Sequence, residues 1–96
     1  MKISVLYPET DRCEMQIPPN GILIGRSPAC NIRLTDEFAS AKHCKIFYKN
    51  ETLIIEDLGS TNGTTLDGTE IGISNPTPIN PGQNIQIGIS VLKMTQ

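Results

Sequence analysis

Short apolar segments separated by turn residues run through the whole sequence of 96 residues. In several of them apolar and polar residues alternate, as at Ile85 and Ile87, which predicts strands with one buried face. Ten short strands at this spacing indicate an all-β sandwich or barrel rather than a protein with crossover helices. We expect the strands at 2–7, 13–17, 22–25, 31–34, 42–49, 52–56, 64–66, 69–71, 84–87 and 90–94.

The composition supports an all-β chain of one domain, residues 1–96. Fourteen Ile and nine Thr favour strands, whereas only three Ala, with eight Gly and seven Pro, oppose long helices. A net charge of −2 gives no overall basic excess for binding a nucleic-acid backbone, so we expect no nucleic-acid partner. No apolar stretch approaches the roughly 18 residues of a membrane span, and we expect no membrane insertion.

Turn residues predict how several strands are joined. Asp67-Gly68 suits a two-residue type I′ hairpin turn, and further hairpins are expected at Asn50-Glu51 and Gly88-Ile89. Residues 18–21 and 76–82 are expected to be loops. In the longest strand, alternation assigns Cys44, Ile46 and Tyr48 to the core and His43, Lys45, Phe47 and Lys49 to the opposite face.

The three cysteines, Cys13, Cys30 and Cys44, have no paired spacing that would predict disulfides. Together with His43, the only histidine, they could in principle supply zinc ligands. However, His43 and Cys44 are adjacent and point to opposite faces of a strand. We therefore expect no metal site, and we expect no cofactor. The three thiols are expected to be buried and reduced, which suits a reducing, cytoplasmic compartment.

Three loop segments carry polar residues beyond those that turns require. They are Gly25-Arg26-Ser27, Ala39-Ser40-Ala41-Lys42-His43 and Gly59-Ser60-Thr61-Asn62-Gly63-Thr64. Each is unremarkable alone, because Asn-Gly is a common turn and an isolated arginine is usually solvated. Loops at one end of a sandwich can nevertheless converge.

Taken in order, these segments resemble the forkhead-associated (FHA) domain, whose pattern is Gly-Arg, a short strand, Ser-Arg-x-His and Ser-x-Asn-Gly. The match covers roughly residues 21–71 and includes Ile32-Arg33-Leu34 and Asp57. The resemblance implies an FHA/SMAD-like sandwich of two sheets with eleven, mostly antiparallel strands. It also implies binding of phosphothreonine peptides through loops at one end.

The residue types at the matching positions suit a phosphate ligand. Phosphothreonine carries about −1.5 to −2 charges and three acceptor oxygens. The resemblance gives Arg26 the role of phosphate cation, and a guanidinium forks well onto phosphate. It makes the hydroxyls of Ser40 and Thr61 further donors, and it places Asn62, with an amide donor and a carbonyl acceptor, against the peptide backbone.

The sequence departs from the family pattern at Ala41, where arginine is usual. The backbone amide of Ala41 can still face the phosphate, and Lys42 can add a long-range charge, although alternation aims it elsewhere. We therefore expect a phosphate pocket of normal outline and somewhat weaker binding. Gly25, His43 and Gly63 match as structural support, with His43 bracing loops by hydrogen bonds.

Selectivity beyond the phosphate depends on Phe38 in the resemblance. FHA domains generally read a side chain three residues after the phosphothreonine, and Phe38 lies in the corresponding loop. An exposed Phe38 would favour an apolar peptide residue there. A Phe38 packed in the core would have no such role, and the sequence leaves both arrangements open.

These observations predict a phosphothreonine-dependent binding module in Ser/Thr kinase signalling. A module on the same fold that binds proteins or forms oligomers without phosphate is the alternative, which Ala41 favours. No acid–base pair, nucleophile elbow or nucleotide loop is visible, so we expect no enzyme activity. The chain can also be part of a larger multidomain protein.

Overall fold

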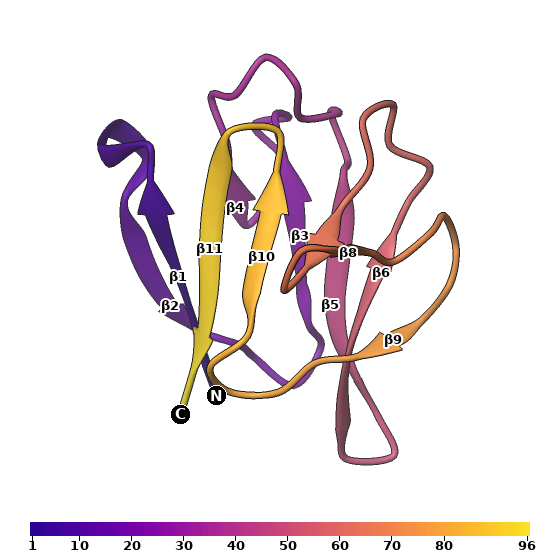
Figure 1. Ribbon diagram of the computed structural model, residues 1–96. Helices are drawn as coiled ribbons and strands as arrows, with labels where there is room; N and C mark the ends of the chain where they lie inside the picture. The colour runs from indigo at the N-terminus through magenta and orange to yellow at the C-terminus, as the bar shows by residue number, and fades with distance from the viewer.

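The computed structural model describes residues 1–96 and contains eleven strands in two sheets (Figure 1). The first sheet has the order β2-β1-β11-β10-β7-β8 and the second has the order β4-β3-β5-β6-β9. The predicted all-β sandwich is confirmed. The strands are Lys2–Tyr7 (β1), Cys13–Gln16 (β2), Ile22–Gly25 (β3), Ile32–Arg33 (β4), Cys44–Lys49 (β5), Thr52–Asp57 (β6), Thr65–Leu66 (β7), Thr69–Glu70 (β8), Thr77–Pro78 (β9), Asn84–Ile87 (β10) and Ser90–Thr95 (β11).

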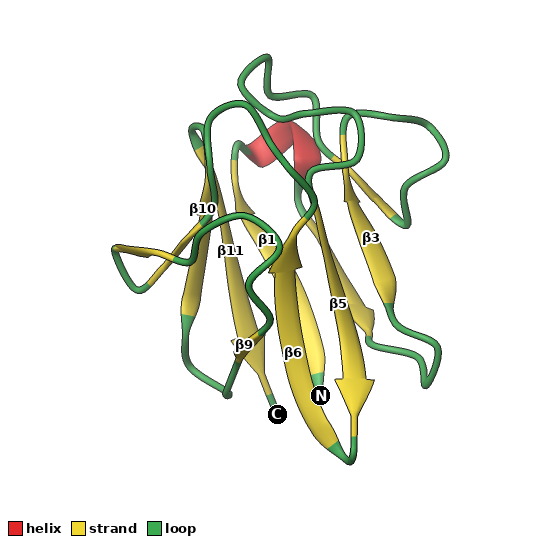
Figure 2. Ribbon diagram, turned by 90° about the vertical axis from the view of Figure 1, so that its right-hand side faces the viewer, coloured by secondary structure: helices red, strands yellow, loops and turns green.

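All strand pairs are antiparallel except β3 and β4, which run parallel at the edge of the second sheet. Figure 2 shows β10, β11 and β1 of the first sheet beside β6, β5 and β3 of the second. The only helix is one 3₁₀ turn, Glu9–Asp11 (η1). No helix of the structure is long and apolar enough to cross a membrane.

The core lies between the sheets and consists mainly of isoleucine. Ile22, Ile46 and Ile55 are neighbours across β3, β5 and β6, and all three point inward because side chains alternate along each strand. Opposite them, Val5, Leu92 and Ile85 align across β1, β11 and β10. Each such side chain stabilises the fold by about 1.5–3 kcal/mol, and together 19 buried residues form one continuous cluster.

The predicted hairpins are present. Asp67 and Gly68 have φ values of 49° and 82° between β7 and β8, which is the two-residue positive-φ pattern of a type I′ turn. Asn50-Glu51 joins β5 to β6, and Gly88-Ile89 joins β10 to β11. These turns fix the register of the strands on either side.

Three expectations about β9, Tyr48 and Cys13 were wrong. Thr77–Pro78 forms the short strand β9 against Ile54 and Ile55 of β6, within a segment expected to be a loop. Two residues carry too little apolar pattern to predict a strand. Tyr48 is 37% exposed because it lies close to the hairpin turn at the end of the sandwich. Cys13 is exposed at the start of the edge strand β2, whereas Cys30 and Cys44 are buried as expected.

Candidate functional site

The loops that carry the polar motifs converge at one end of the sandwich. The β3–β4, β4–β5 and β6–β7 loops and the β10–β11 turn lie at the top of Figure 1, and both termini lie at the opposite end. A surface depression of about 370 Å³ opens among the first three loops. Its lining contains six of the residues singled out in the sequence and two of their neighbours. It consists of Arg26, Glu37, Phe38, Ala39, Ser40, Ala41, Thr61 and Asn62.

The first two loops are joined by their backbones. The amides of Arg26 and Ser27 donate to the carbonyl oxygens of Ser40 and Ala41, each at 3.0 Å. Gly25 makes this approach possible, because a Cβ on it would lie 2.8 Å from the Ser40 oxygen and even closer to that of Ala41. Glycine at this position therefore holds Arg26 against the β4–β5 loop.

Ser40 connects the β4–β5 loop to the β6–β7 loop. Its Oγ accepts a hydrogen bond from the Thr61 amide at 3.1 Å, which leaves the hydroxyl proton free for a ligand. The hydroxyl of Thr61 makes no hydrogen bond within the protein, and the Thr61 side chain is exposed. Both hydroxyls can thus donate to a bound anion.

His43 is fully buried beneath these loops, contrary to its expected place on the face opposite the core. It precedes β5, so strand alternation does not apply to it. Nδ1 accepts from the Ser40 amide at 3.0 Å, and Nε2 lies 2.9 Å from the carbonyl oxygen of Gly63. The first bond requires an unprotonated Nδ1, so Nε2 carries the proton and donates to Gly63. His43 therefore braces two loops.

Asp57, at the end of β6, organises the third loop. Its carboxylate accepts from the amides of Gly59 and Ser60 and from the hydroxyls of Ser60 and Thr64. Burial raises the pKa of Asp57, but these hydrogen bonds outweigh burial and leave the pKa below its ordinary value. Asp57 belongs to the residues that match the family pattern, but the sequence alone assigns it no role. Asp-x-x-Ser before Asn-Gly was the signal, because an aspartate can bond amides two and three residues ahead.

Asp36 performs a similar task between the β4–β5 loop and the β10–β11 turn. Its Oδ2 accepts from the amides of Ile89 and Ser90 and from the Ser90 hydroxyl, and its Oδ1 accepts from the Phe38 amide. Burial raises the pKa of Asp36, yet the hydrogen bonds outweigh that effect and lower it. This contact spans more than fifty residues of sequence and could not be read from local pattern.

Asn62 and Phe38 meet at the edge of the depression. Nδ2 of Asn62 donates to the carbonyl oxygen of Phe38 at 2.9 Å, which leaves the Asn62 Oδ1 without a partner in the protein. The Phe38 side chain is 52% exposed, so the arrangement with Phe38 in the core is excluded. Ile89, 50% exposed in the adjacent turn, adds further apolar surface near it.

Ala41 and Lys42 differ in their relation to the depression. Ala41 is exposed and lines it, and the Ala41 amide makes no hydrogen bond within the protein. Lys42 is exposed but does not line it. Arg26 is also exposed and forms no ion pair. No group of three or more His, Cys, Asp or Glu side chains is placed to hold a metal ion.

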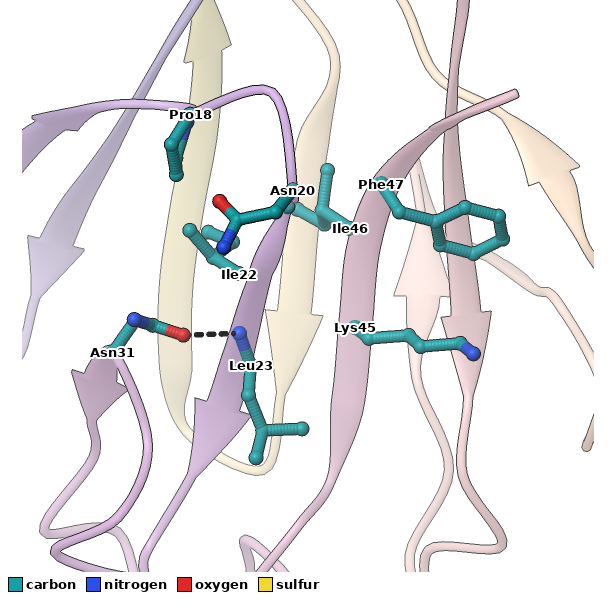
Figure 3. A pocket seen from close by; sticks show the side chains of 9 residues that line it. Pro18, Asn20, Ile22, Leu23, Asn31, Lys45, Ile46 and Phe47 are labelled. Atoms are coloured by element: carbon teal, nitrogen blue, oxygen red, sulfur yellow. Dashed lines mark hydrogen bonds between the residues drawn. The ribbon is translucent and has the colours of Figure 1, made fainter. Parts of the chain in front are cut away.

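A second hollow, of about 330 Å³, lies away from these loops on the outer side of β3 and β5 (Figure 3). There Asn31 Oδ1 accepts from the Leu23 amide at 2.8 Å, and Lys45 Nζ lies 4.9 Å from the centre of the Phe47 ring. Its lining combines apolar side chains with one cation. It offers none of the convergent hydroxyl and guanidinium donors of the loop end.

Comparisons with known proteins agree on one family. The sequence profile of the FHA domain matches residues 22–88. The chain is 37% identical over 73 residues to the FHA domain-containing protein FhaB of Mycolicibacterium smegmatis, which is 76% of this chain and 46% of that protein. The chain thus spans about half the length of this relative.

Solved structures show the same fold. The FHA domain of the CT664 protein from Chlamydia trachomatis superposes with a TM-score of 0.88 at 26% identity, covering 99% of this chain and 95% of that one. The N-terminal FHA domain of S. cerevisiae Rad53p, solved in complex with a phosphothreonine peptide, gives a TM-score of 0.81 at 20% identity over 99% and 92% of the two chains.

Proposed function

The chain belongs to the FHA domain family, and on this basis we propose that it binds phosphothreonine in partner proteins. FHA domains are binding modules, and a phosphothreonine peptide is bound in the Rad53p structure. The observation that carries the proposal is the convergence of Arg26, Ser40, Thr61 and Asn62 on one depression. The Arg26 guanidinium, the hydroxyl protons of Ser40 and Thr61 and the Oδ1 of Asn62 have no partner within the protein. We take residues 1–96 as one such domain because a single core cluster spans both sheets.

Each residue has a defined task in the proposed complex. Arg26 donates to two phosphate oxygens, and the hydroxyls of Ser40 and Thr61 donate to the others. The free Oδ1 of Asn62 accepts from a peptide amide while its Nδ2 stays on Phe38. The unpaired Ala41 amide adds one donor, although the side chain of Ala41 adds none. Lys42 contributes charge without direct contact.

Phe38 is the proposed specificity residue. Its exposed ring, with Ile89 nearby, forms an apolar border to the depression. A peptide residue three positions after the phosphothreonine would pack there. An apolar residue is favoured at that position, and Glu37 in the same lining disfavours an acidic one.

The partners proposed are substrates of a Ser/Thr kinase, because only such a kinase creates the ligand. Three free thiols fit a reducing compartment such as the cytoplasm. The greater length of the FhaB relative suits a domain that works within a larger protein. Neither a cofactor nor catalysis is required for this function.

Binding of a phosphothreonine peptide library, measured by fluorescence anisotropy, tests the proposal. We expect Arg26→Ala to weaken binding at least tenfold, because charged hydrogen bonds contribute about 1.5–3 kcal/mol each. Ser40→Ala should weaken it less. Phosphoserine peptides should bind more weakly by about 0.8 kcal/mol if the threonine methyl is buried.

Lys49→Gln, which removes a charge at the opposite end of β5, is the matched control and should bind like the wild type. Binding that survives Arg26→Ala, or that ignores the phosphate, would refute the proposal. The second outcome would favour a phosphate-independent interaction module, for which the hollow on the outer side of β3 and β5 offers a surface.

A further inference from the structure

A second arginine stands beside Arg26 at the loop end. Arg33, the last residue of β4, lines a depression of about 330 Å³ next to the one described above. Arg26 and Ala41 line both depressions, so the two adjoin across these residues. The lining of this second depression is Arg26, Ser27, Arg33, Leu34, Thr35 and Ala41.

The position of Arg33 follows from the edge strand that carries it. β4 pairs in parallel with β3, which places Arg33 opposite Gly25, directly before Arg26. Ile32 and Leu34 are buried on either side, so alternation turns Arg33 outward. Its Nε donates to the carbonyl oxygen of Arg26 at 3.0 Å. This bond fixes the guanidinium next to Arg26 through one nitrogen only.

The two terminal nitrogens of Arg33 have no partner in the protein. The only ion pair of the structure joins Lys2 to Glu14, and neither arginine has a carboxylate within ion-pair distance. Thr35, which lines the same depression, donates from its amide and hydroxyl to the carboxylate of Asp11, and that carboxylate does not line the depression. Two adjacent uncompensated guanidinium groups beside an open depression attract anions.

Ala41 lines both depressions. Its methyl group supplies neither a charge nor a hydrogen-bond donor there. The positive charge that Ala41 does not supply from the β4–β5 loop is therefore available from Arg33 on β4. It lies on the side of Arg26 away from Phe38, which lines only the first depression.

We propose that Arg33 is a second anion-binding residue of the phosphopeptide site, which receives an acidic group flanking the phosphothreonine in the same peptide. This proposal rests on the proposed function. The group is an oxyanion, supplied either by an Asp or Glu side chain or by a second phosphate. An extended peptide advances about 3.3–3.6 Å per residue, and the two depressions adjoin, so the positions to test are those up to about four residues from the phosphothreonine.

The test measures the affinities of three kinds of phosphothreonine peptide by fluorescence anisotropy. The first kind has neutral flanks. The second carries one glutamate, placed in turn at each of these flanking positions. The third carries a second phosphothreonine at the position where glutamate gives the tightest binding. The wild type should bind its best acidic peptide about three- to tenfold more tightly than the neutral one. The glutamate and phosphate peptides show which source of the oxyanion binds more tightly.

Arg33→Gln should reduce the ratio between acidic and neutral peptides to about one, and Arg33→Lys should restore part of it. The ratio separates this role from a structural one, because displacing Arg26 through its lost carbonyl contact would weaken all peptides equally. Lys49→Gln, at the far end of the sandwich, should leave the ratio unchanged. Ala41→Arg should raise the affinity for acidic peptides more in the Arg33→Gln background than in the wild type.

A neutral phosphopeptide that binds in an Arg26-dependent way, without any preference for acidic flanks, would overturn the role of Arg33 and leave the proposed function intact. A preference that survives Arg33→Gln would overturn it as well. Failure of every phosphopeptide to bind the wild type would overturn both.

Discussion

Asp57→Asn should cost about 2–4 kcal/mol of unfolding free energy, although it changes only one atom of a buried side chain. The Asn Oδ1 can keep the bonds from the Gly59 and Ser60 amides, but these fall from charged to neutral strength, a loss of about 0.5–1 kcal/mol each. The new amide group then faces the hydroxyls of Ser60 and Thr64, which now donate to Oδ2. Reversing those two bonds costs a similar amount, because Ser60 Oγ already accepts from Gly63.

The lowered pKa of Asp57 gives the prediction its pH dependence. The folded-state pKa lies below the unfolded value of about 3.9, so the carboxylate stabilises the fold fully above that value. This contribution is lost as the pH falls through the folded-state pKa. The wild type should therefore approach Asp57→Asn in stability under strongly acidic conditions, while the lowered pKa of Asp36 makes both proteins less stable there.

Urea denaturation followed by circular dichroism, at pH 7 and at pH values below about 4, measures both effects. Glu51→Gln is the control, because it removes an exposed carboxylate without hydrogen bonds at the β5–β6 turn. It should stay within about 0.5 kcal/mol of the wild type. An Asp57→Asn protein as stable as the wild type at pH 7, or a difference independent of pH, would refute the reasoning.

Two further substitutions test the loop end. Gly25→Ala should lower the unfolding free energy by about 1–3 kcal/mol and weaken phosphopeptide binding, because its Cβ would collide with the Ser40 and Ala41 carbonyl oxygens. Urea denaturation measures the free energy, and a variant as stable as the wild type would contradict this expectation. Phe38→Ala should leave stability nearly unchanged and remove any preference for an apolar residue three positions after the phosphothreonine. A degenerate phosphopeptide library measures that preference, and a preference that persists would remove Phe38 from the site.

The sequence predicted most of the fold because local pattern determines most of it. β3 and β10 have the predicted bounds, and the Asp67-Gly68 turn has the expected positive φ values, since these features depend on neighbouring residues. β9 was missed because its two residues become a strand only by pairing with β6. Tyr48 alternates correctly but lies where the sandwich ends, and no local signal marks that end.

The candidate site shows the same division between local and distant information. Motif order was sufficient to gather Arg26, Ser40 and Asn62, and the structure brings them to one depression. The contact between Asp36 and the β10–β11 turn and the exposure of Phe38 depend on how distant loops meet. Neither has a periodicity or spacing that a single sequence reveals.

The distribution of charge explains how a chain with a net charge of −2 can offer an anion site. Asp36 and Asp57 are buried beneath the loops, where loop amides and hydroxyls turn inward to bind them. Arg26 and Arg33 lie at the surface, and their guanidinium groups have no carboxylate partner. The acids therefore fix the shape of the loops, while the guanidinium groups are left free for the proposed ligand. Since electrostatic interaction weakens with distance and with screening, the nearby exposed cations govern binding more than the net charge does.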